Sequence, residues 1–172
     1  RRDLRDCRRA RNAAEAIGTI EKDQEIFGLT KGQFSLLDVI THTLEQIGPA
    51  ALTVSTWTAA QAELGAVLDF TRSGAVTDAW WLVDLSFQRR APELAAAIRD
   101  TFGPDSIRVA KNHAKFTLLR NAEWSIVLRT SMNLNQNPRL ENFTLAHDPQ
   151  LADFLGEIIQ EIWDRQPARL AH

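Results

Sequence analysis

Five residues in the second half of the chain have the types and spacing that phosphate chemistry requires. His113 and Lys115 stand two residues apart at the start of an expected strand, so their side chains point to the same side. Ser131 and Asn133 repeat this spacing, and Glu141 follows them. Lysine neutralises phosphate oxygens, serine and asparagine donate hydrogen bonds, and histidine can attack phosphorus to form a covalent intermediate. The pattern therefore predicts a phosphate site.

These positions resemble the motif His-x-Lys-x4-Asp-x6-Gly-Ser-x-Asn of the phospholipase D superfamily, which a later glutamate accompanies. The matched residues are His113, Lys115, Ser131 and Asn133, with Glu141 as the later acid. The segments 34–57 and 59–84 resemble the helices and strands that open this fold. The resemblance extends over about residues 30–165.

The chain departs from this motif at three points. Arg120 stands where the family has its aspartate, and Thr130 stands where it has glycine. Ser131 comes 18 residues after His113, three more than the motif expects, so Glu123 is a second candidate for the aspartate position. In the family that aspartate supports the structure and the histidine environment, so its loss leaves the nucleophile in place.

The resemblance implies a phosphodiesterase of nuclease type without a metal or other cofactor. Family active sites pair two motifs, so a chain with one motif implies a homodimer. His113 would then attack a phosphodiester of nucleic acid, with DNA favoured, and the partner's His113 would protonate the leaving oxygen. Lys115, Ser131 and Asn133 would hold the phosphoryl oxygens. An alternative stays open, because Arg120 favours a weakly active or inactive phospholipase D-like subunit for DNA binding or assembly; lipid hydrolysis is the weakest reading.

The charge of the chain is uneven. Its net charge is −2, but residues 1–12 hold six arginines against two aspartates. Such an asymmetry is typical of a basic arm that binds nucleic acid, and a solvated helix face is the competing interpretation. The arginines of this segment are Arg1, Arg2, Arg5, Arg8, Arg9 and Arg11.

Periodicity predicts the elements that position these residues. Apolar residues recur at helical spacing over 2–20, and residues 21–33 look like a linker. The chain then alternates between strands and helices, which predicts an α/β fold with a mixed, mostly parallel sheet flanked by helices. Further helices are expected over 34–47, 59–72, 91–102 and 150–165, and strands over 51–57, 76–85, 106–109, 115–119, 125–130 and 142–146.

Composition limits the class of protein. The 172 residues are 44% hydrophobic and 24% charged, which suits one globular domain. We expect a basic helix and linker over 1–29 and a phospholipase D-like domain over 30–172. Cys7 is the single cysteine, so no disulfide can form within the chain, and no apolar run approaches the roughly 18 residues of a membrane span. We therefore expect a cytoplasmic protein without a membrane partner.

Overall fold

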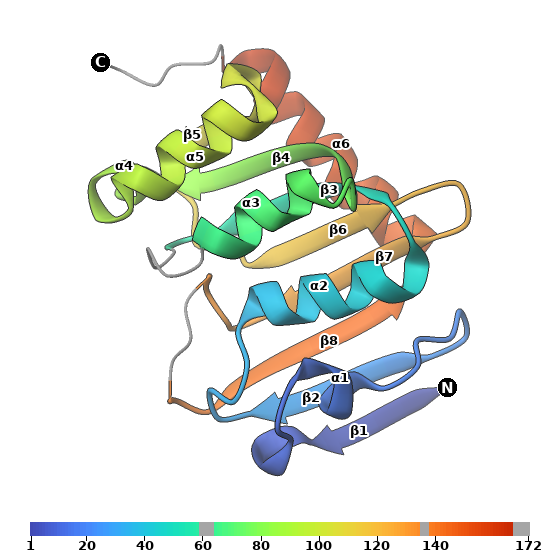
Figure 1. Ribbon diagram of the computed structural model, residues 1–172. Helices are drawn as coiled ribbons and strands as arrows, with labels where there is room; N and C mark the ends of the chain where they lie inside the picture. The colour runs from blue at the N-terminus through green and yellow to red at the C-terminus, as the bar shows by residue number, and fades with distance from the viewer. Residues whose placement is uncertain (59–63, 135–137, 167–172) are drawn as a thin grey trace.

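The computed structural model describes residues 1–58, 64–134 and 138–166 (Figure 1). Within these residues eight strands form one sheet in the order β1-β2-β8-β7-β6-β3-β4-β5. The strands are β1 (Arg2–Asp6), β2 (Glu25–Thr30), β3 (Ala50–Thr56), β4 (Val76–Asp84), β5 (Ile107–Ala110), β6 (Phe116–Arg120), β7 (Ser125–Thr130) and β8 (Glu141–His147). The helices are α1 (Ala13–Ile17), α2 (Leu36–Ile47), α3 (Leu64–Arg72), α4 (Phe87–Arg90), α5 (Pro92–Phe102) and α6 (Pro149–Arg165), with 3-10 turns η1 (Cys7–Arg9) and η3 (Pro104–Ser106).

Helices cover both faces of the sheet. In Figure 1, α2, α3 and α5 lie in front of the sheet and α6 lies behind it. The larger core lies on the first face, where Leu37 and Ile40 of α2 pack with buried strand residues such as Leu52. On the second face Ala152 of α6 packs against Leu118 and Val127. Burying each large apolar side chain contributes about 1.5–3 kcal/mol, so this two-sided core holds the central strands in place.

The predicted elements after residue 34 are present where the structure describes them. The capping box of Ser35 and Asp38 begins α2, and Gly48 ends it with a positive φ of 80°. Of the predicted helix over 59–72, residues 59–63 lie outside the described residues and α3 forms the remainder. The short helix α4 was not predicted.

The expected α/β fold is confirmed, but the sheet is not mostly parallel. Among the described strands, four of the seven neighbouring pairs are antiparallel, namely β2–β8, β8–β7, β7–β6 and β6–β3. The reason is that β6, β7 and β8 follow one another without a crossover helix, and short connections join antiparallel neighbours. The parallel pairs β3–β4 and β4–β5 lie at the β5 side of the sheet, where helical crossovers through α3 and α5 connect the strands.

The predicted helix over 2–20 was correct only for Ala13–Ile17, which form α1, and the predicted linker over 21–33 was wrong because it contains β2. Arg2–Asp6 forms the edge strand β1, which pairs in parallel with β2, and β2 pairs with β8. Alternating charges suit an edge strand because they discourage pairing with other chains. Gly28 lies in β2 because a side chain there would collide with the ring of Phe143 on β8. Residues 1–29 thus add two strands to the same sheet rather than a basic helix.

The strand directions bring several loops to one end of the sheet, which we call the site end. Strands β1, β2, β3, β4, β5 and β7 finish there, whereas β6 and β8 begin there. The loops that carry the motif residues all lie at this end. In the described part of the chain, no helix has the length and apolar character to cross a membrane.

Candidate active site

The structure brings the five predicted site residues to the site end. His113 and Lys115 lie in the loop just before β6, which begins at Phe116. The predicted strand began at Lys115, so neither residue lies within a strand. Ser131 and Asn133 follow β7, and Glu141 is the first residue of β8. Because β6 lies beside β7 and β7 beside β8, these loops are neighbours.

His113 and Lys115 form a close pair. The Lys115 Nζ atom lies 3.4 Å from Nδ1 of His113 and donates a hydrogen bond of 3.2 Å to the His113 carbonyl oxygen. His113 is exposed, whereas Lys115 is half-buried. Burial lowers the pKa of the Lys115 ammonium from its ordinary value of 10.5, and the Glu141 carboxylate raises it. The pair therefore presents an accessible imidazole beside a partly desolvated cation.

Ser131 and Glu141 join the loop after β7 to the start of β8. The Ser131 hydroxyl donates to the Glu141 carboxylate and accepts the backbone N–H of Asn142 at 3.0 Å. A pocket of about 510 Å³ opens here, and Lys115 and Arg129 line it together with Ser131. A phosphate in this pocket would meet the Lys115 ammonium and the Arg129 guanidinium, which pairs with Glu25, whereas the Ser131 hydroxyl would have to turn from Glu141 to donate to it. His113 and Asn133 are not among the residues that line this pocket.

Asn133 has one side-chain polar atom without a partner among the described residues. Its Oδ1 atom is buried and accepts no hydrogen bond from the described residues. The next residue, Leu134, donates its backbone N–H to the carbonyl oxygen of Thr58 at 3.2 Å. This bond ties the Asn133 loop to the end of β3, next to Trp57.

Trp57 forms a wall beside His113. The ring centroids of Trp57 and His113 are 5.6 Å apart. The Arg90 guanidinium lies 4.5 Å from the centroid of the Trp57 ring and makes a cation–π contact with it. The structure places Trp57 at the site, half-buried, with Arg90 from the unpredicted helix α4.

Sequence reasoning missed Asn112, which anchors the His113 loop. The buried Nδ2 atom of Asn112 lies 3.0 Å from Ser55 Oγ, 3.2 Å from the Thr56 carbonyl and 3.3 Å from the Leu82 carbonyl. Its Oδ1 atom accepts the N–H of Ala114 at 3.1 Å. One side chain thus connects β3, β4 and the residues on both sides of His113. The signal that could have found it is an asparagine two residues after the end of β5 and directly before the motif histidine.

Arg120 lies away from this site. It ends β6, at the opposite end of the sheet from His113, and its guanidinium pairs with Asp153 of α6. Glu123, the other candidate for the missing aspartate, is exposed in the turn between β6 and β7 at that same far end. The departure from the motif therefore changes a contact between β6 and α6 and removes no group from the site end.

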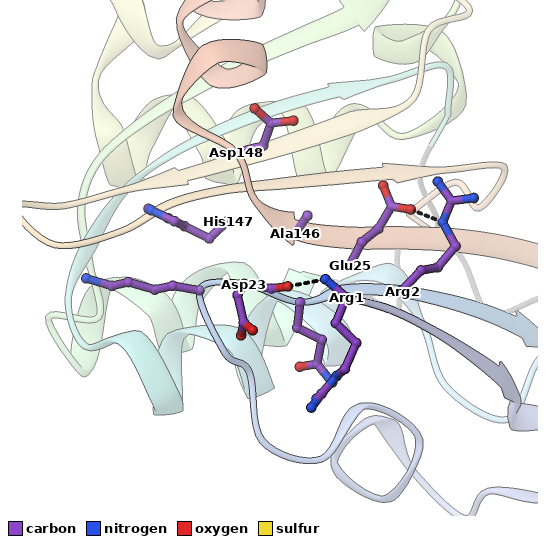
Figure 2. Close-up of a pocket in the computed structure, with 9 residues that line it drawn as sticks. Arg1, Arg2, Asp23, Glu25, Ala146, His147 and Asp148 are labelled. Carbon is purple, nitrogen blue, oxygen red and sulfur yellow. Dashed lines mark hydrogen bonds and ion pairs between the residues drawn. The ribbon is translucent and has the colours of Figure 1, made fainter.

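Most of the N-terminal arginines lie away from the site end or already form ion pairs with carboxylates. Arg1 and Arg2 border a separate pocket of about 480 Å³ at the far end of the sheet, beside Glu25 and His147 (Figure 2). Five of the six arginines pair with carboxylates: Arg1 with Asp3 and Glu21, Arg2 with Glu25, Arg5 with Asp3, Arg8 with Asp6, and Arg11 with Glu15. Arg9 is exposed and pairs with no carboxylate of the described residues.

No metal site stands out in the described part of the chain, where no three histidine, cysteine, aspartate or glutamate side chains are grouped as ligands.

Replacing Glu141 with glutamine is expected to lower the pKa of Lys115 further, because the change removes the carboxylate that opposes the effect of burial. Lysine is charged below its pKa. As pH rises, any activity that needs the Lys115 ammonium should therefore be lost at a lower pH in Glu141→Gln than in the wild type. An NMR titration of Lys115 measures the shift, and the exposed Glu157→Gln on α6 is the control. An unchanged Lys115 titration in Glu141→Gln contradicts the assigned electrostatic contact.

Comparison with known proteins identifies the fold. No protein-family model and no curated protein matches the chain. Among solved structures, Nuc from Salmonella typhimurium, described as a phospholipase D family member, has a TM-score of 0.54 over 82% of this chain and 94% of Nuc, at 18% identity. The chain has the phospholipase D fold. NucT from Helicobacter pylori has a TM-score of 0.52 over 81% of this chain and 96% of NucT, at 11% identity.

The phospholipase D-like chain also resembles part of a larger enzyme. Polyphosphate kinase from Porphyromonas gingivalis has a TM-score of 0.58 at 16% identity. The match covers 87% of this chain but only 27% of the kinase. At these identities the likeness concerns the fold, and the roles of individual residues in this phospholipase D-like chain have to be argued from its own site.

Proposed function

We propose that the chain is a phosphodiesterase of nuclease type that cleaves nucleic acid through a covalent phosphohistidine, at an active site completed by a homodimer. The observation that carries this proposal is the accessible His113 imidazole beside the half-buried Lys115 ammonium, next to the Ser131–Glu141 contact. The phospholipase D fold, shared with Nuc and NucT, supports it.

The proposed reaction has two steps. In the first, a ring nitrogen of His113 attacks phosphorus, the P–N bond forms, and the P–O bond to the leaving group breaks. The leaving oxygen takes a proton from the partner's His113, which acts as general acid. In the second, water attacks phosphorus and gives its proton back to the partner's His113 as the P–N bond breaks. Lys115 and the polar groups of Ser131 and Asn133 stabilise the phosphoryl oxygens throughout.

The need for a partner follows from the histidines of the described chain. His42 lies in α2, with Nε2 at 3.0 Å from the Gly18 carbonyl oxygen, and His147 ends β8 at the far end of the sheet. Neither lies at the site end, so the described part of one subunit supplies a single histidine there. A two-fold axis near His113 supplies the second from an identical subunit.

Nucleic-acid contact by the N-terminal arginines is assigned to Arg9 in this proposal. Arg9 follows β1 at the site end and pairs with no described carboxylate, whereas Arg1 and Arg2 lie at the far end. The competing function, a weakly active or inactive subunit for DNA binding or assembly, rests on the absence of the motif aspartate. It is an outcome of the test below.

The proposed dimer is tested by mixing subunits. Under exchange conditions, equal amounts of wild type and His113→Ala should leave about one quarter of the wild-type activity, since only dimers with two intact histidines react. Oligonucleotide cleavage should persist in EDTA. A residual activity of about one half indicates that each subunit acts alone, and nucleic-acid binding without any cleavage by the wild type supports the inactive subunit instead.

A further inference from the structure

We propose that six exposed cations around the site end form a binding track for several consecutive phosphates of a nucleic-acid strand. We call this set the cationic rim, and it consists of Arg9, Lys31, Arg89, Arg90, Lys111 and Arg139. This proposal rests on the proposed nuclease function. It states which residues bind the nucleic-acid strand on either side of the cleaved phosphate.

Strand topology places every rim residue at the site end. Arg9 follows β1, Lys31 follows β2, and Lys111 follows β5. Arg89 and Arg90 lie in α4, directly after β4, and Arg139 comes shortly before β8. The six residues belong to five different loops, so no sequence window shows them as a cluster.

The rim residues lack the ion pairs that other cations of the chain make. None of the six pairs with a carboxylate in the described part of the chain. Exposed acids lie at both ends of the sheet. Glu21, Asp23, Glu45 and Glu123 are at the far end, and Asp6, Asp38 and Glu93 lie toward the site end, where Asp6 pairs with Arg8. The six rim residues, which make no ion pair with a described carboxylate, therefore place positive charge around the end of the sheet where His113 lies.

The dimensions of the rim suit a nucleic-acid strand. Eight neighbouring strands spaced about 4.8 Å apart span about 34 Å from β1 to β5. That length corresponds to about ten nucleotides at 3.4 Å along each strand of a duplex. Arg90 joins the rim to the site, because its guanidinium lies 4.5 Å from the Trp57 ring, whose other neighbour is His113.

An anionic membrane is the competing partner, since Leu85 and Leu140 are 57% and 59% exposed at the same end. The two leucines belong to separate loops, after β4 and before β8, and form no apolar helix face of the kind that enters a bilayer. A row of cations across the whole sheet fits a linear polyanion better.

Two matched triple variants of the full chain test the rim. The rim variant carries Lys31→Gln, Lys111→Gln and Arg139→Gln; the control variant carries Lys22→Gln, Arg72→Gln and Arg165→Gln, which remove three exposed charges away from the site end. Binding to a 12-base-pair fluorescent duplex is measured between 50 and 200 mM salt. The rim variant should bind at least about tenfold more weakly, with a salt slope shallower by roughly 0.9 for each lost contact. The control variant should match the wild type.

A substrate with one phosphate separates this inference from the proposed function. Cleavage of bis(p-nitrophenyl) phosphate should be unchanged in the rim variant, because that substrate cannot reach the rim. If the wild type does not cleave it or any oligonucleotide, the proposed function fails, while the salt slopes still test the rim. Equal slopes for the rim variant and the wild type overturn the rim. So does a loss confined to binding of phosphatidylserine vesicles, which would assign the surface to a membrane.

Discussion

His113→Ala is expected to reduce cleavage of a single-phosphate diester by at least about 10³-fold, without a measurable change in melting temperature. The side chain is exposed, so its removal leaves no cavity, yet it supplies both the nucleophile and, across the proposed dimer, the general acid. Steady-state kinetics with bis(p-nitrophenyl) phosphate and thermal unfolding of the same preparation measure the two effects.

Lys115→Ala is expected to share much of this loss, because the ammonium beside His113 is the nearest cation to the reacting phosphate in the proposed mechanism. Lys111→Ala is the matched control: it removes an exposed lysine from the same loop and should leave cleavage of the single-phosphate substrate unchanged. Retention of activity in His113→Ala would reject the covalent-histidine mechanism, and equal losses in the two lysine variants would reject the role assigned to Lys115.

Asn112→Ala is expected to destabilise the fold by about 2–4 kcal/mol, and to lower activity as well. The change leaves the Thr56 and Leu82 carbonyls without their partner in a buried setting, and it removes the acceptor of the partly buried Ala114 N–H. It also frees the loop that holds His113. Denaturant unfolding gives the stability change, and cleavage of the single-phosphate substrate at a temperature where the variant is folded gives the loss of activity.

Two further variants sharpen the Asn112 experiment. Asn112→Asp should be at least as destabilising as alanine at neutral pH, since a carboxylate cannot donate to the Thr56 and Leu82 carbonyls. Asn142→Ala removes an exposed asparagine at the same end of the sheet and should change stability by no more than about 0.5 kcal/mol. A small effect of Asn112→Ala on both stability and activity contradicts its role as the anchor of the loop.

The sequence alone was sufficient for most local elements after residue 34 and for the five motif residues of the candidate site. Apolar periodicity and the Gly48-Pro49 stop located α2 to within two residues, because helix signals lie within one stretch of chain. The two-residue spacings of His113 with Lys115 and of Ser131 with Asn133 were enough to select the proposed chemistry, since that proposal depends on residue type.

Tertiary structure alone decided which side chains meet. The N-terminal segment looked helical because Leu4 and Cys7 fit a helical spacing, but pairing with β2 made it a strand and left Leu4 75% exposed. In the sequence, Arg120 replaces the aspartate of the motif. In the structure, Arg120 ends β6 at the far end of the sheet and pairs with Asp153. Asn112 and the cationic rim have no local signature. Their partners come from loops far apart in sequence, which become neighbours only when the strands align in one sheet.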